Sequence, residues 1–281
     1  MALYSDVLLT VDFDRTLTAP DSTIPERNIQ AIQYFMENGG AFTVNTGRSV
    51  AMFRPYMERI PHNAPFLLYN GSAAYQDGAL ELLHPIELPL QKTLEEVAAE
   101  FPDLNVELQG VSAHFRLAEN PEWDAFYDAV SCVHEQIRFE GFTEPFLKFS
   151  VFGRIREYNV AHLFSGSPEE LARMDAVEAW LRERYGDRVE IFRAAPRIVD
   201  IHAKGVSKIH AARELQQALG RKILVCVGDA ENDLPMLRGA DYAFCPADGV
   251  VAKAFPNVCP CSEGAVADVI YEKIPEILKK S

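Results

Sequence analysis

Asp12 and Asp14 stand two positions apart at the end of an apolar run, residues 7–11, that indicates a buried strand. On an extended backbone, side chains two positions apart point to the same side, so the two carboxylates arrive together at the end of the strand. This arrangement is costly without a cation, because two unit charges about 4 Å apart repel by roughly 4 kcal/mol at an effective dielectric constant near 20. The pair therefore indicates a site for a cation, unless it only caps the strand and solvates a turn.

A second acidic cluster lies more than two hundred residues later in the chain. The apolar run 223–227 ends in Gly228-Asp229, and Asn232 and Asp233 follow. Two strands that each end in acids predict one oxygen-lined metal site at the carboxyl edge of a parallel sheet. Mg²⁺ typically takes one or two carboxylates together with water and substrate phosphate, and Asp12 and Asp229 could supply these. The alternative is that the second cluster only caps the following helix and favours its dipole.

Two further segments have the residue types that bind an anion. Thr46-Gly47-Arg48 lies between a predicted strand and a predicted helix, where a hydroxyl and free backbone N–H groups can hold a phosphate, although Thr46 could simply be an N-cap. Lys208 follows Ser207, a plausible N-cap, so it falls in a first helical turn, where a cation opposes the helix dipole. An acidic cluster or a phosphate in front of the helix would reverse that penalty. Lys204 is a competing candidate.

Alternating strands and helices must position these residues. The first 85 residues and the last 80 alternate apolar runs with helical patterns, which predicts right-handed βαβ units and a parallel sheet. The expected strands are 6–12, 41–45, 66–69, 223–228 and 241–245, and the expected helices are 25–38, 49–59, 207–219, 232–238 and 264–279.

The middle of the chain has a different pattern. Helices are expected at 90–101, 121–137 and 168–184, and strands at 104–109, 112–117, 146–152, 188–193 and 197–202. Neighbouring strands without a helix between them indicate an antiparallel sheet with helices on one face. The predicted fold class is therefore α/β: a Rossmann-like parallel-sheet core, residues 1–86 and 197–281, interrupted by an inserted α+β domain, residues 87–196.

Composition limits the classes of partner. The chain has 281 residues and a formal net charge of −14, which argues against nucleic acid or an anionic membrane as the main partner but not against a small phosphorylated ligand. Five scattered cysteines are expected to be reduced and structural, although Cys259-Pro260-Cys261 could be part of a metal site. Neither a signal segment nor a long apolar run is apparent, so a soluble cytoplasmic protein is expected.

Four segments together resemble the haloacid dehalogenase superfamily, and more closely its Cof-type phosphatases with a type IIB cap. They are Asp12-Phe-Asp-Arg-Thr-Leu17, Thr46-Gly-Arg48, Gly205-Val-Ser-Lys208 and Gly228-Asp-Ala-Glu-Asn-Asp-Leu-Pro-Met-Leu237. Asn70-Gly71 and Glu263-Gly-Ala-Val-Ala267 also fall where this family has similar residues. The order and separations agree over the whole chain, including an insertion between the second and third segments.

The resemblance implies a role for each site residue. Asp12 would be the nucleophile that forms an aspartyl-phosphate, and Asp14 would protonate the leaving oxygen and later deprotonate water. Mg²⁺ would be bound by Asp12, the backbone carbonyl of Asp14 and Asp229. The phosphate-binding residues would be Thr46, Gly47, Lys208 and Asn232. Asp233 would belong to the metal's surroundings and could orient Lys208.

One position departs from the family pattern, which usually has Gly where this chain has Arg15; Arg15 could add a contact to the phosphate, but we expect it to point to solvent. In the family, the inserted cap closes over the site and its residues select the leaving group. The candidates for that role are His114, Arg116, Trp123, Lys148 and Arg154. Each also has an ordinary interpretation: Trp123 would pack, and Lys148 would lie on a solvated face.

The predicted function is a Mg²⁺-dependent phosphatase that hydrolyses a small phosphorylated metabolite, with sugar phosphates the substrates that the resemblance favours and pyridoxal phosphate and flavin mononucleotide as others. Two alternatives remain at this point: a phosphomutase or phosphotransferase with the same residues, and a catalytically silent phosphate-binding regulator. Asp14 argues against the regulator, because a binding protein needs no acid at the leaving-group position. A monomer or weak homo-oligomer is expected.

Overall fold

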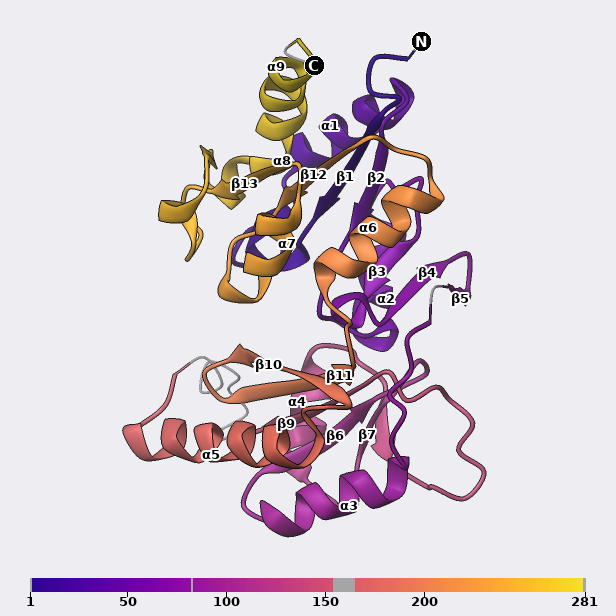
Figure 1. Cartoon of the computed structure of the whole chain (residues 1–281), viewed down its shortest axis with the longest axis vertical. Coiled ribbons are helices and arrows are strands. Elements are labelled where there is room, and N and C mark those ends of the chain that lie inside the picture. Colours follow the sequence, from indigo (N-terminus) through magenta and orange to yellow (C-terminus); the bar gives the residue numbers. More distant parts are fainter. Residues whose placement is uncertain (1, 82, 154–164, 280–281) are drawn as a thin grey trace. The chain divides into compact units, whose positions relative to one another are not determined.

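The computed structural model describes residues 2–81, 83–153 and 165–279, which form two compact units (Figure 1). The first unit comprises residues 1–47, 56–82 and 207–281, and the second comprises residues 48–55 and 83–206. The predicted insertion, 87–196, lies inside the second unit. The second unit extends further, because strand β11 (Ile198–Ala203) pairs with β10 (Val189–Ala195) in its sheet.

The first unit contains a five-stranded parallel sheet in the order β14-β13-β12-β1-β2. Its strands are β1 (Val7–Val11), β2 (Ala41–Val44), β12 (Ile223–Val227), β13 (Tyr242–Pro246) and β14 (Asn257–Val258). Its helices are α1 (Glu26–Glu37), α6 (Lys208–Ala218), α7 (Leu234–Gly239), α8 (Ala265–Asp268) and α9 (Ile274–Leu278), with a π-helical turn η7 (Val269–Lys273) joining the last two. Every residue of β1 is buried, as expected for a central strand of a parallel sheet covered on both faces.

Short segments complete this unit. A three-stranded antiparallel sheet is built from β3 (Phe66–Leu68), β4 (Ala73–Gln76) and β5 (Ala79–Glu81). The helical turns are η1 (Phe13–Leu17), η2 (Tyr69–Gly71), η4 (Glu231–Asp233), η5 (Ala252–Ala254) and η6 (Cys261–Glu263). The β4–β5 hairpin was not predicted, although Asp77-Gly78, both at positive φ, is a sequence typical of such a turn.

The second unit contains a six-stranded sheet in the order β10-β11-β9-β6-β7-β8, antiparallel except for the β7–β8 pair. The strands not yet given are β6 (Asn105–Gln109), β7 (His114–Arg116), β8 (His134–Gln136) and β9 (Lys148–Phe152). The helices are α2 (Val50–Met57), whose first part belongs to this unit, α3 (Leu90–Glu100), α4 (Pro121–Ala129) and α5 (Pro168–Tyr185).

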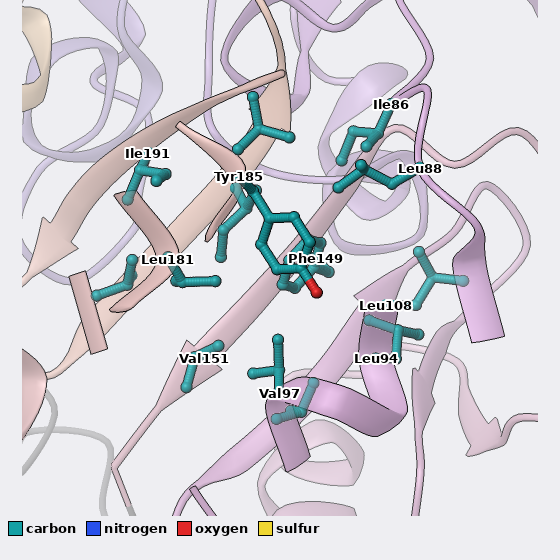
Figure 2. Close-up of a cluster of buried hydrophobic side chains, with 14 of the residues drawn as sticks. Ile86, Leu88, Leu94, Val97, Leu108, Phe149, Val151, Leu181, Tyr185 and Ile191 are labelled. Carbon is teal, nitrogen blue, oxygen red and sulfur yellow. The ribbon is translucent and has the colours of Figure 1, made fainter. Parts of the chain in front are cut away.

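Apolar side chains of α3 and α5 pack against one face of the six-stranded sheet. Figure 2 shows Val97 of α3 and Leu181 of α5 near the sheet residues Leu108, Phe149 and Val151. The parallel-sheet core and the additional antiparallel sheet together confirm the predicted α/β fold class.

The predicted helix 121–137 was wrong in its second half, since α4 ends at Ala129 and β8 follows. Ser131 adopts φ 54°, a left-handed conformation that ends a helix, and the Cys132 N–H donates to the carbonyl of Tyr127. The β-branched residues Val130 and Val133 flank this turn and favour extended backbone over helix.

Candidate active site

The acids from opposite ends of the chain meet at the carboxyl edge of the parallel sheet. β1 pairs with β12 so that Val11 lies opposite Val227, which brings the residues after each strand, Asp12 and Gly228-Asp229, to the same edge. Carboxylate oxygens of Asp12, Asp229 and Asp233 lie within 4.8 Å of one another, and all three residues are buried. The carboxyl edge of a parallel sheet therefore carries three buried acids.

Tight turns hold the acids in place. The Asp233 Oδ2 accepts hydrogen bonds from the backbone N–H groups of Asp229, at 3.0 Å, and Ala230, at 3.1 Å. Gly228 allows this close approach, because a Cβ there would lie 2.7 Å from the Cβ of Asp233. The Thr16 hydroxyl, in η1, donates to Asp229 Oδ1 at 3.1 Å. Each carboxylate of the second cluster is thus oriented by hydrogen bonds before any ligand binds.

Lys208 lies among these acids. It is the first residue of α6, after the N-cap Ser207, and its Nζ donates to Asp12 Oδ1 at 2.5 Å and to Asp233 Oδ1 at 2.7 Å. The acids in front of the helix offset the unfavourable helix dipole at this position. The competing candidate, Lys204, belongs to the second unit, where its Nζ donates to the Gly186 carbonyl at 3.0 Å and pairs with Glu190.

One ammonium group faces three buried carboxylates, and the pKa values shift accordingly. Burial opposes the charge of Lys208, but Asp12 and Asp233 outweigh it and raise the pKa of the lysine. Burial, reinforced by the neighbouring carboxylates and opposed by Lys208, raises the pKa of Asp12. Burial and Asp233 raise the pKa of Asp229 to about 6, against the lowering effects of Thr16, Lys208 and Arg15. The cluster is therefore short of positive charge near neutral pH.

The donor set fits a hard divalent cation. Its oxygens come from carboxylates, which Mg²⁺ prefers, and a dication would offset the burial and the mutual repulsion that raise the pKa of Asp12 and Asp229. Asp12 and Asp229 are the better ligands, because both oxygens of Asp233 already accept hydrogen bonds from Lys208 or the backbone. The observed contact of Asp233 is with the Lys208 ammonium, which donates to its Oδ1.

Mg²⁺ is expected to raise the melting temperature more at pH 7.5 than at pH 5.0. Below about pH 6, Asp229 keeps a proton that competes with the metal. Without metal, the pH dependence of stability has the opposite sign. A carboxyl group whose pKa is about 6 in the folded protein, but about 3.9 in the unfolded chain, contributes less stability as pH rises between those values. Thermal unfolding at fixed Mg²⁺ concentration tests this. Equal shifts at both pH values, or a shift unchanged in Asp229→Asn, would contradict it.

The remaining predicted phosphate-binding residues lie in the same unit. The Thr46 N–H donates to the Leu67 carbonyl at 2.9 Å, and its carbonyl accepts from the Asn70 N–H at 2.9 Å, which fixes the backbone after β2. Thr46 is buried, and Gly47 lies so close to Asn70 that a Cβ would be 2.9 Å from the Asn70 amide oxygen. Asn232 is half-buried in η4. Whether these residues bind phosphate stays a prediction.

The η1 turn determines the positions of Asp14 and Arg15. Asp14 is exposed, unlike Asp12, so the two acids end in different environments despite their spacing. Arg15 is exposed, as predicted, and has φ 60°, a left-handed conformation that glycine adopts at lower cost. This backbone explains why Gly is usual at the position.

The candidate selectivity residues are held within the second unit. Lys148 is buried in an ion pair with Asp200 at 2.6 Å, so the expectation of a solvated face was wrong. Trp123 packs in the interior, Arg116 binds Asp124 at 2.8 Å, and His114 Nε2 lies 2.6 Å from the Ser49 hydroxyl. Sequence spacing alone did not reveal the ion pairs that Lys148 and Arg116 make with Asp200 and Asp124. Arg154 lies outside the described residues.

Two residues at the site were not predicted from the sequence. Thr16 binds Asp229, and the buried Asn45 donates to the backbone carbonyl of Lys208. The spacing Asp-x-Asp-x-Thr was visible in the sequence, but a threonine in a turn is ordinary, and nothing local marks Asn45. All five cysteines are free of disulfides. Within the described residues, no helix combines the length and apolar character needed to cross a membrane.

Comparisons with known proteins show which family the chain resembles. The family described as haloacid dehalogenase-like hydrolase matches residues 9–270. A curated relative, 5-amino-6-(5-phospho-D-ribitylamino)uracil phosphatase YitU of Bacillus subtilis, is 24% identical over 254 residues, covering 87% of this chain and 88% of its own length. An HMP-PP phosphatase of Escherichia fergusonii is 24% identical over 255 residues, covering 89% of this chain and 86% of its own.

Solved structures share the fold. A haloacid dehalogenase-like hydrolase from Bacteroides thetaiotaomicron superimposes with a TM-score of 0.75 at 20% identity, over 95% of this chain and 98% of that one. A subclass IIB sugar phosphatase of the superfamily gives a TM-score of 0.73 at 20% identity, over 96% and 99%. The resemblance drawn from the four sequence segments is confirmed, and so is the prediction of a phosphatase. The chain belongs to the haloacid dehalogenase-like hydrolase family.

Proposed function

We propose that this phosphatase hydrolyses small phosphorylated metabolites through an aspartyl-phosphate on Asp12, with Mg²⁺ as cofactor. The contact of the Lys208 ammonium with Asp12, at 2.5 Å within a cluster of buried acids, carries the proposal. A lysine held against a carboxylate at the edge of a parallel sheet can neutralise an incoming phosphoryl group. We include in the proposal the assignment of the second unit as the cap domain of this family.

In the first step an Asp12 carboxylate oxygen attacks phosphorus, and the bond from phosphorus to the ester oxygen breaks. Asp14 donates its proton to that oxygen, which leaves as an alcohol. In the second step water attacks phosphorus, Asp14 takes its proton, and the bond from phosphorus to Asp12 breaks to release inorganic phosphate. The exposed position of Asp14 suits this role, because it must exchange protons with a leaving group and with water.

Other residues of the first unit hold charge and orientation. Lys208 donates to the transferring phosphoryl oxygens, and Asp233 keeps its ammonium directed at Asp12. Thr46, Gly47 and Asn232 contribute donors to the phosphate. Asp12 and Asp229 would hold the metal ion, which would supply charge neutralisation when bound.

A panel of metabolite phosphates, assayed for released phosphate with and without Mg²⁺, tests this function. Sugar phosphates come first, followed by pyridoxal phosphate, flavin mononucleotide and the substrates named for the two curated relatives. We expect Mg²⁺-dependent release of phosphate from at least one small monoester. An isomeric phosphate ester formed without released phosphate would instead favour a mutase. Release that is unaffected by chelation would overturn the metal assignment.

A further inference from the structure

Asn45 connects the strand beside Asp12 to the helix that begins with Lys208. Its backbone N–H donates to the carbonyl of Val11, the residue before Asp12, at 2.8 Å. Its buried side-chain Nδ2 donates to the backbone carbonyl of Lys208 at 2.8 Å. One residue therefore holds the backbone of both partners of the Lys208–Asp12 contact.

The lysine side chain needs such a support. Its four-carbon stem is flexible, so the place of its Nζ depends on where its backbone is held. Gly71 supports the same helical turn from another side: it has φ 96°, and a Cβ there would lie 2.6 Å from the Ser207 carbonyl oxygen. The start of α6 is thus held at two points on the first unit.

The hydrogen bond from the Asn45 side chain to the Lys208 carbonyl is expected to add little net stability to the fold. Among the described residues, the Asn45 Oδ1 is buried and has no hydrogen-bond partner. A buried acceptor without a partner opposes stability, which offsets the gain from the Nδ2 bond. Removing this side chain is therefore expected to change the stability of the fold little, while releasing the backbone of Lys208.

We propose that Asn45 is a positioning residue for the phosphatase reaction, which holds Lys208 in register with Asp12. This inference rests on the proposed function. Asn45 acts through Lys208 and makes no contact with the reacting atoms in this scheme. Because a displacement of about 1 Å at a reacting centre can reduce a rate up to about a hundredfold, the loss of this hydrogen bond has a measurable effect on catalysis.

Two variants separate positioning from stability. Asn45→Ala removes the donor, and Asn45→Asp keeps the shape but replaces the donor with an acceptor that faces the Lys208 carbonyl. Asn63→Ala is the matched control, because Asn63 donates to the Gly40 carbonyl and accepts from the Phe42 N–H, both at 2.9 Å, at the opposite end of β2. We expect kcat on an aryl phosphate to fall about tenfold in Asn45→Ala and further in Asn45→Asp, and to stay within about twofold in the control.

A second measurement, made without metal, observes the Lys208 ammonium group directly. The ¹⁵N signal of a protected Lys208 ammonium, assigned by its loss in Lys208→Met, is expected to shift or broaden in Asn45→Ala and to persist in Asn63→Ala. If Asn45→Ala changed neither the ammonium signal nor kcat, the inference would be overturned. It would also be overturned if the lower melting temperature of Asn45→Ala accounted for all of its lost activity. If the wild-type protein hydrolyses no phosphate ester, the proposed function is refuted instead. The ammonium signal then still decides whether Asn45 positions Lys208.

Discussion

Replacement of Asp12 by asparagine is expected to lower kcat on an aryl phosphate by about 10⁴-fold or more while the fold remains intact. The amide cannot act as the nucleophile that forms the acyl phosphate. Stability should change little, because burial and the neighbouring acids oppose the negative charge of Asp12, which raises the pKa of its carboxyl group. Lys208 is expected to keep its contact with Asp233, which measures 2.7 Å in the wild-type protein. Steady-state kinetics and thermal unfolding measure the two effects.

Asp6 offers the matched control for this experiment. It lies just before β1, at the opposite end from Asp12, and is paired with Lys222 on the surface. Asp6→Asn removes an acid next to the other end of β1 and is expected to leave kcat within about twofold of the wild type. Residual turnover in Asp12→Asn comparable to that of the control would remove Asp12 from the nucleophile role.

Replacement of Lys208 by methionine is expected to lower kcat/KM by about a thousandfold and also to destabilise the fold. Removing one partner of a buried charge pair typically costs about 3–5 kcal/mol, because the remaining charges are left uncompensated. Asp12 and Asp233 raise the pKa of Lys208, so its contribution to stability is complete below the unfolded pKa of about 10.4 and is lost only as pH rises above it. The loss of stability should therefore be present in full at pH 7.

Replacement of Lys204 tests the alternative left open by the sequence, in which Lys204 is the phosphate-binding lysine. Lys204→Met removes an exposed lysine four residues away that binds Gly186 and Glu190. Its kcat/KM and melting temperature are expected to stay close to those of the wild type. If Lys204→Met lost activity and Lys208→Met kept it, the phosphate-binding lysine would be misassigned. Protein that is folded by circular dichroism at 15 °C allows the comparison even if Lys208→Met is much less stable.

The sequence was sufficient to predict most of the first unit. Buried apolar runs separated by helices favour a parallel sheet whose carboxyl ends share an edge, and this arrangement places Asp12 near Asp229. Helix α6 was marked by Ser207 at its N-cap, so Lys208 was expected in its first turn. These signals are local in the sequence, and the observed fold is consistent with all of them.

The boundaries inside the second unit were less predictable. The pattern from 121 to 137 is apolar at helical spacing, but a left-handed residue at Ser131 ends α4 early, and the β-branched Val130 and Val133 beside it are only a weak signal of that end. The ion pair of Lys148 with Asp200 joins strands about fifty residues apart, so its burial followed from sheet pairing and not from local pattern. The strand 197–202 was assigned to the wrong side of the predicted boundary for the same reason, since its partners are β9 and β10.

The amino-acid order by itself determined most elements of the first unit, the class of fold and the meeting of the two acidic segments, because hydrophobic periodicity and strand ends depend on neighbouring residues. Only the tertiary structure decided that Lys208 contacts both Asp12 and Asp233, that Thr16 binds Asp229 and that Asn45 holds the start of α6. These contacts are hydrogen bonds a few ångströms long between residues up to 213 positions apart. Their geometry depends on how the strand ends and helix α6 pack together, which side-chain type and spacing do not encode.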